Sequence, residues 1–165
     1  MITELGHYAL ILALATALVQ SLVPLIGAQR NDAGMMAVGP MAANLSFVLV
    51  AFSFLTLTYA YVISDFSLLN VVENSHSMKP MLYKITGVWG NHEGSMLLWV
   101  LILVLFSSLV ASFGRNLPDK LRANVLSVQA WITVAFLLFI LLTSNPFIRL
   151  TNPPAEGNDL NPILQ

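Results

Sequence analysis

The chain has 165 residues, of which 57% are hydrophobic and only 9% are charged, and its mean hydropathy is +0.78. Because charged residues approach a quarter of an average soluble domain, this composition excludes an ordinary water-soluble protein and indicates an integral membrane protein. The net charge of −1 gives no basis for nucleic-acid binding, and the lack of cysteine excludes disulfides, zinc–thiolate sites and thiol chemistry by the chain itself.

Four windows of the sequence contain no Asp, Glu, Lys or Arg: residues 5–29, 33–64, 94–114 and 123–148. Each is long enough to cross a hydrocarbon core of about 30 Å as a helix. We therefore predict an all-α polytopic membrane protein with four transmembrane helices. Their expected ranges are about 6–27, 40–64, 95–113 and 124–144, with a loop over 65–94 and an irregular tail over 145–165.

The first predicted helix carries small side chains at a four-residue spacing, which favours close contact with another helix. They are Ala9, Ala13, Ala17 and Ser21. Pro24 is expected to kink or end this helix, because proline removes a backbone donor and clashes with the preceding turn. His7 lies close to the membrane surface and is more typical of an interfacial residue than of a ligand.

The second predicted helix begins near Pro40 and ends in a segment with Tyr59 and Tyr61, which we expect to anchor it in the interfacial aromatic belt. The long loop that follows mixes apolar and polar residues, so we expect it to fold back on the membrane or on a partner. It contains His76 and Met78, which are able to bind haem or metal but in an exposed loop most often bind neither.

The stretch from Lys84 to Trp99, KITGVWGNHEGSMLLW, combines glycines with polar and aromatic residues directly before the third span. Its glycines permit sharp turns and close approach of a ligand. His92 and Glu93 are expected at the N-terminus of a helix, and helical spacing places His92, Met96 and Trp99 on one face. With the flat surface of Trp89, this pattern suits a planar amphiphilic ligand such as haem.

A purely structural interpretation of the same stretch stays open. Trp89 and Trp99 are then interfacial anchors, Asn91 caps the third helix, and His92 and Glu93 hydrogen-bond the loop. The spans contain no acidic or basic residue, which disfavours a pump or coupled carrier, and the motifs of HExxH, Walker and GxSxG enzymes are missing. We assign no catalytic and no metal-binding residue.

Basic residues indicate the orientation. Arg30, Arg115, Lys120 and Arg122 fall in two short connections, whereas Lys79, Lys84 and Arg149 fall in the longer segments on the other side. By the positive-inside rule, both termini and the loop over 65–94 are expected on the extracytoplasmic side.

Several long strings closely resemble the N-terminal region of the CcmF family of cytochrome c haem lyase subunits, and a paralogous family in nitrite reductase assembly is also similar. The strings are YKITGVWGNHEGSMLLW, DFSLLNVVENS, LLFILLTSNPFIRL and PAEGNDLNPILQ. The resemblance covers essentially the whole chain. It implies a multi-pass protein of the bacterial inner membrane whose motif loop faces the periplasm.

The resemblance further implies cytochrome c maturation with haem as the group handled. The expected partners are a CcmE-type haem chaperone, a CcmH-type thioredoxin-like subunit, apocytochrome c and membrane lipid, with no nucleic acid. Trp89, His92 and Glu93 map onto a family signature expected to support a haem site, and Gly90, Gly94 and Ser95 complete that signature. Trp99 is added as a possible haem-site residue because of its helical spacing from His92. The tryptophan-rich WWD domain and the haem-ligating histidines of the family are not present up to Gln165, so the isolated chain is expected to be inactive.

A truncated product and one piece of a split lyase both fit this resemblance. An alternative function is a structural or assembly subunit of a membrane complex that handles no haem. A transporter fragment is weaker because the spans lack charge.

Overall fold

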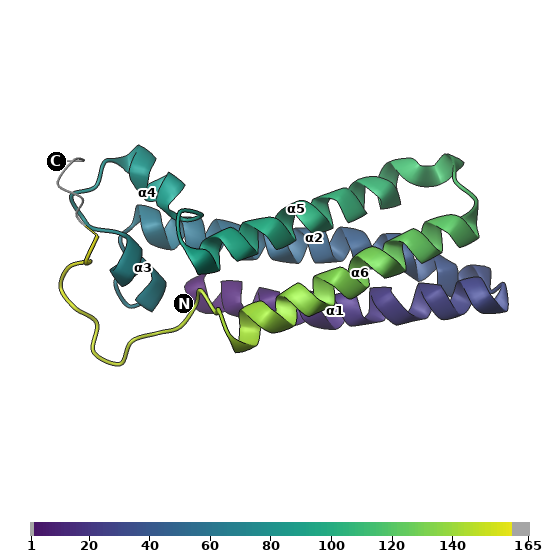
Figure 1. Cartoon of the computed structure of the whole chain (residues 1–165), viewed down its shortest axis with the longest axis horizontal. Coiled ribbons are helices and arrows are strands. Elements are labelled where there is room, and N and C mark those ends of the chain that lie inside the picture. The colour runs from purple at the N-terminus through teal and green to yellow at the C-terminus, as the bar shows by residue number, and fades with distance from the viewer. Residues whose placement is uncertain (1, 160–165) are drawn as a thin grey trace.

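Four long helices lie side by side in a computed structural model that describes residues 2–159 (Figure 1). They are α1 (Ile2–Arg30), α2 (Ala33–Val62), α5 (His92–Phe113) and α6 (Asp119–Leu142). All four are long and apolar enough to cross a membrane, which confirms the predicted multi-pass helical fold. Two short helices, α3 (Leu69–Asn74) and α4 (Met81–Gly87), and a 3₁₀ turn, η1 (Gly114–Asn116), complete the described elements.

The first two helices are longer than the sequence predicted. α1 does not end at Pro24 but continues to Arg30, and Pro24 is buried against Gly39 of α2. A neighbouring helix packed at this point makes a proline tolerable inside a membrane helix. α2 begins at Ala33 rather than near Pro40, because the Asp32 carboxylate accepts hydrogen bonds from the amides of Gly34 at 2.9 Å and Met35 at 3.1 Å.

Small side chains let α1 and α2 approach closely. The four small residues predicted as a helix–helix interface on α1 are all buried, which confirms that prediction. Gly6 continues the same contact, since a Cβ atom built on it would lie 1.9 Å from Thr56 Oγ1 of α2. In hydrocarbon such close backbone approach replaces the hydrophobic effect as the main source of helix association.

A buried polar side chain joins three helices in the half of the bundle that lies away from the loop over 65–94. The amide nitrogen of Gln20 on α1 donates to Ser107 Oγ on α5 and to the carbonyl of Leu126 on α6, both at 3.0 Å. Gln20 is only 2% exposed, so neither bond competes with water. These bonds fix the positions of α1, α5 and α6 relative to one another along the bundle axis.

Apart from the two short connections at the other end, the remaining described residues form a small cap at one end of the bundle, which we define as residues 63–91 together with 143–159. The two parts of the cap pair through an isolated antiparallel bridge between Leu68 and Arg149. The amide of Asn158 also donates to the carbonyl of Val72 at 2.7 Å. The long loop therefore folds against the chain's own tail. That tail is irregular up to Asp159, as predicted, and residues 160–165 lie outside the described part.

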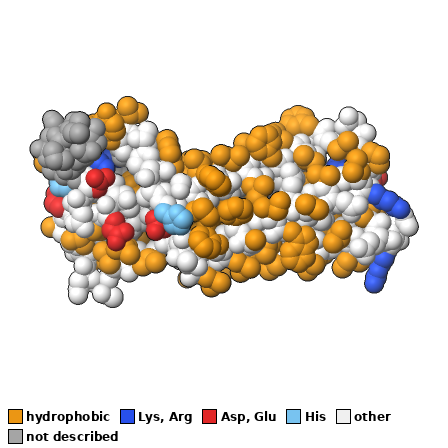
Figure 2. All heavy atoms as spheres, in the orientation of Figure 1, with side chains coloured by type: hydrophobic (Ala, Val, Ile, Leu, Met, Phe, Trp, Pro, Cys, Tyr) orange, Lys and Arg blue, Asp and Glu red, His pale blue; other side chains and the backbone are white. Residues whose placement is uncertain are grey.

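Charge and hydrophobicity are segregated along the molecule. Figure 2 shows hydrophobic side chains covering the middle of the visible face, with acidic and histidine side chains near the cap and blue basic side chains at the opposite end. The opposite end is where the two short connections carry Arg30, Arg115, Lys120 and Arg122. This distribution is typical of a helix bundle that crosses a bilayer with its long axis along the membrane normal.

Candidate functional site

The glycine-rich motif lies at the junction between the cap and the bundle, where the chain passes from α4 into α5. Asn91 is the N-cap of α5, and its side-chain oxygen accepts from the amide of Gly94 at 2.8 Å. This confirms the prediction that Asn91 is the N-cap of the third transmembrane helix. The Asn91 side-chain nitrogen donates to the carbonyls of Gly87 at 3.0 Å and Val88 at 3.2 Å, which closes the turn between the two helices.

A hydrogen-bond network joins the N-cap residue Asn91 to α2 and α3. The Tyr61 hydroxyl donates to Asn70 Oδ1 at 2.6 Å and accepts from Asn91 Nδ2 at 2.9 Å. Asn70 Nδ2 in turn donates to Asn91 Oδ1 at 3.0 Å and to Glu93 Oε2 at 3.2 Å. Three helices therefore share one set of polar contacts at the start of α5, and we call Tyr61, Asn70, Asn91 and Glu93 the junction network.

The burial of Tyr61 corrects the sequence prediction. Tyr61 is fully buried and holds the junction network, whereas Tyr59 is 45% exposed and matches the expected interfacial anchor. The two tyrosines look alike in sequence, because the residues that distinguish them are distant along the chain. Asn70 was also missed: it sits in an apolar stretch of the loop, and no local pattern reveals that it is only 4% exposed.

Gly94 is required by packing rather than by backbone conformation. A Cβ atom on it would lie 1.6 Å from the carbonyl oxygen of Val88, whereas the closest atoms to a Cβ on Gly87 and Gly90 lie at 3.5 Å and 3.6 Å. Among the described residues no glycine has positive φ, so the expected turn at these glycines does not use that conformation. The group that approaches Gly94 closely is thus the Val88 carbonyl of the chain itself and not a ligand.

The predicted ligand-facing residues divide between two sides of α5. Trp89 stacks on Phe54 of α2, with ring centroids 6.5 Å apart. His92 instead meets Phe139 of α6 edge to face at 6.2 Å. Trp99 is 63% exposed and also borders α6. The structure thus places His92 and Trp99 on the side of α5 that faces α6, whereas Trp89 lies in the turn before α5 and packs against α2.

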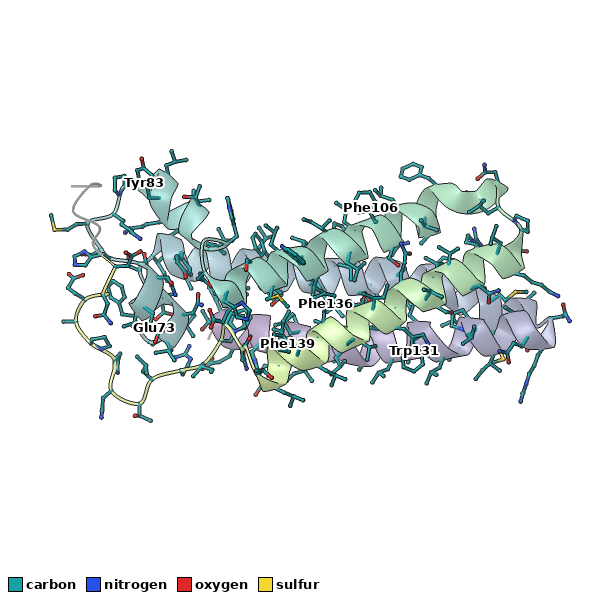
Figure 3. All side chains as sticks on the ribbon, in the orientation of Figure 1. Glu73, Tyr83, Phe106, Trp131, Phe136 and Phe139 are labelled. Carbon is teal, nitrogen blue, oxygen red and sulfur yellow. The ribbon has the colours of Figure 1, made fainter. Side chains whose placement is uncertain are left out.

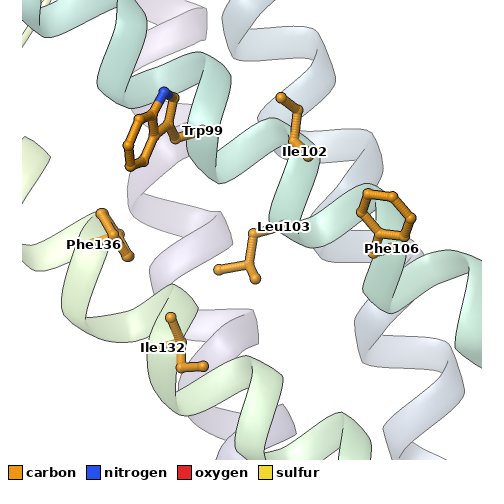
Figure 4. Close-up of a pocket in the computed structure, with 6 residues that line it drawn as sticks. All are labelled: Trp99, Ile102, Leu103, Phe106, Ile132 and Phe136. Carbon is orange, nitrogen blue, oxygen red and sulfur yellow. The ribbon is translucent and has the colours of Figure 1, made fainter.

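An apolar groove runs between α5 and α6. One hollow of about 320 Å³ is lined by Trp99, Ile102, Leu103 and Phe106 of α5 and Ile132 and Phe136 of α6 (Figure 4). A second hollow of about 300 Å³ is lined by Met96, Ala135, Phe136 and Phe139. Phe136 belongs to both, and Figure 3 shows Phe136 and Phe139 on α6 on the side near α5. The groove therefore runs along the third span from Met96, and His92 contacts Phe139 next to it.

These residues match some features of a haem-contacting surface. The groove offers aromatic and aliphatic walls to a flat apolar ring, and no described residue forms a hydrogen bond with the His92 ring, which leaves an imidazole available. The neighbouring charged residue of the motif is Glu93, an acid, which does not complement haem carboxylates. The described chain thus supplies one wall and one imidazole rather than an enclosed haem site.

Comparisons with known proteins agree on one family. Residues 89–165 match a family profile described as "Cytochrome C assembly protein". Over all 165 residues the chain is 67% identical to the cytochrome c-type biogenesis protein CycK of Rhizobium meliloti, covering 100% of this chain and 24% of that protein. It is 66% identical to CycK of Bradyrhizobium diazoefficiens, again over 100% of this chain and 25% of that protein.

A solved structure, "Cytochrome c Heme Lyase CcmF", has the same fold. It matches with a TM-score of 0.85 and 28% sequence identity, over 92% of this chain and 26% of its own. The chain thus spans about a quarter of the length of the relatives it matches. From the whole-chain identities and the shared four-helix fold, we conclude that this chain is similar over its length to about a quarter of the cytochrome c-type biogenesis proteins CycK and CcmF.

Proposed function

We propose that the chain acts in cytochrome c maturation as the four-helix membrane portion of a CcmF-type haem lyase. The observation that carries this proposal is the match of 92% of this chain to the haem lyase structure. Haem is the substrate group. It reaches the complex from a CcmE-type chaperone and is attached to apocytochrome c, with a CcmH-type thioredoxin-like subunit as the partner for thiol chemistry, because this chain has no cysteine.

In this role the motif supports the haem site rather than performing the attachment. His92 presents an imidazole at the end of the α5–α6 groove, and Trp99 adds an aromatic wall. The junction network holds the first turn of α5, so that Glu93 and the backbone of His92 keep a fixed position. Trp89 acts from the other side by fixing the motif against α2.

The test replaces His92 and Trp89 by alanine in the protein as expressed in its bacterial host. Haem staining of c-type cytochromes after electrophoresis reports maturation, and co-purification of the partner subunits reports assembly. We expect His92→Ala to lower maturation with assembly intact, while His76→Ala in the cap serves as the matched control. Loss of assembly in His92→Ala and Trp89→Ala would instead support the alternative function, a scaffold that handles no haem.

We also propose that the bundle lies in the bacterial inner membrane with the cap in the periplasm. The concentration of basic residues in the two short connections at the other end supports this orientation. Since the chain has no native cysteine, single-cysteine variants report it directly. Met78→Cys, at a side chain that is 75% exposed in the cap, should react with an impermeant maleimide in intact spheroplasts, and Lys120→Cys only after lysis. The reverse pattern would refute the orientation.

A further inference from the structure

The two short helices of the cap have opposite patterns of burial. In α3 the hydrophobic side chains of Val71 and Val72 are buried and the charged side chain of Glu73 is exposed. In α4 the charged residue, Lys84, is only 9% exposed, whereas four large hydrophobic residues are between 36% and 66% exposed. We call these four residues the α4 face: Met81, Leu82, Tyr83 and Ile85.

Lys84 points toward the end of α2 rather than toward solvent. Its ammonium group donates to Ser64 Oγ at 2.8 Å, which is its only hydrogen bond to a described residue. Helices in water bury their apolar side and expose their charges, whereas charged residues of membrane proteins face the protein interior. The burial pattern of α3 is therefore that of a helix in water, and the pattern of α4 is that of a helix in contact with lipid.

The contacts of α4 and of the turn after it follow α2 back toward the membrane. Lys84 bonds to Ser64, just beyond the end of α2, and Trp89 stacks on Phe54. Between these two contacts the position on α2 moves back by ten residues, which corresponds to about 15 Å of helix. Figure 1 shows α4 at the cap end of α2. The end of α4 that leads into α5 is therefore the deeper one.

The length of α2 places these contacts at the level of the lipid headgroups. Its 30 residues correspond to about 45 Å, which equals the thickness of a bilayer including both headgroup layers. In a centred span, Ser64 lies at the outer limit of the headgroups and Phe54 lies within the hydrocarbon. In the same stretch of α2, Tyr59 and Ile63 are also exposed, so hydrophobic surface continues from the span to the level of α4.

We propose that the α4 face inserts into the headgroup region of the bilayer, which makes α4 an interfacial helix beside the junction network. Lipid fits this face better than a soluble protein does, because the face lies at headgroup depth and continues the lipid-facing surface of α2. The ring of Tyr83, with one polar end, is of a type favoured at this depth. This inference does not depend on the proposed role in haem attachment or on the proposed orientation.

Spin labels on the full chain, reconstituted in vesicles of equal parts phosphatidylcholine and phosphatidylglycerol, test the proposal. Because the chain has no cysteine, Leu82→Cys carries a single nitroxide, whose collision rates with oxygen, which concentrates in lipid, and with a water-soluble nickel chelate are compared. Glu73→Cys, exposed on α3, is the matched control in water, and Val48→Cys, exposed midway along α2, is the control in lipid. We expect the oxygen-to-nickel ratio of Leu82→Cys to exceed that of Glu73→Cys several-fold and to stay below that of Val48→Cys.

Two outcomes of this measurement would overturn the proposal. A ratio equal to that of Glu73→Cys would place the α4 face in water. Slow collisions with both reagents would show that a protein surface covers it.

A second variant tests the depth of α4 independently. Ile85→Cys lies closer to Trp89 along the chain, so its ratio should be higher than that of Leu82→Cys. The reverse order would contradict the placement of α4 along α2. Both substitutions change exposed side chains, and circular dichroism of each variant checks that the helical signal is retained.

Discussion

Replacing Tyr61 by phenylalanine should weaken the attachment of the cap to the bundle. The substitution removes one oxygen atom from a fully buried ring and leaves the packing of the ring unchanged. That oxygen donates to Asn70 Oδ1 at 2.6 Å and accepts from Asn91 Nδ2 at 2.9 Å. Both partners belong to the junction network, so the effect is expected at the contact among α2, α3 and α5.

The substitution affects the hydrogen bonding of Asn70 and Asn91 unequally. Asn91 Nδ2 keeps its bonds to the carbonyls of Gly87 and Val88, whereas Asn70 Oδ1 loses the hydroxyl that satisfies it. A buried acceptor left without a donor costs about 1–3 kcal/mol. We therefore expect Tyr61→Phe to lower the free energy of unfolding by about 2 kcal/mol, which changes the folded-to-unfolded ratio by up to about thirtyfold.

Equilibrium unfolding in mixed detergent micelles, followed by tryptophan fluorescence, measures this change. Tyr59→Phe is the matched control, because it removes the same atom from a ring that is 45% exposed and for which the structure describes no hydrogen bond. The control should change stability by less than about 0.5 kcal/mol. Equal effects of the two substitutions would show that the buried hydroxyl contributes nothing and would refute the reasoning.

Three further substitutions probe other contacts. Gly94→Ala should destabilise the protein by about 1–3 kcal/mol in the same unfolding assay, because its Cβ would lie 1.6 Å from the Val88 carbonyl, while Gly90→Ala should be tolerated; equal tolerance would exclude the close contact. Gln20→Leu should cost about 0.6–1.7 kcal/mol by removing the bonds between α1, α5 and α6, and a double variant with Ser107→Ala should be less than additive. Gly157→Ala should release the tail and speed its cleavage in limited proteolysis, since a Cβ there would lie 1.9 Å from the Ser75 carbonyl; unchanged cleavage would contradict the packing of the tail.

Sequence reasoning succeeded where the physical cause is local or depends on composition. The four spans follow from long charge-free windows, and the cap by Asn91 follows from an amide side chain at a helix start. The small-residue face of α1 follows from its four-residue spacing.

The same reasoning failed where the cause lies in a distant partner. Tyr61 depends on Asn70 and Asn91, which lie nine and 30 residues further along the chain. The continuation of α1 past Pro24 depends on its packing against Gly39 of another helix. In both cases, the neighbouring residues in the sequence are compatible with either outcome, and only tertiary packing decides between them.

The pairing between the two parts of the cap imposes an order on biosynthesis. α3 emerges from the ribosome after two spans, but its partners in the tail, Ile148 and Asn158, emerge only after the fourth. A helix of six residues is not stable by itself in water, so α3 is expected to be fully fixed only when the contacts of Asn70 in the junction network are joined by those with the tail. Full protection of α3 from a protease would therefore report that all four helices have been inserted.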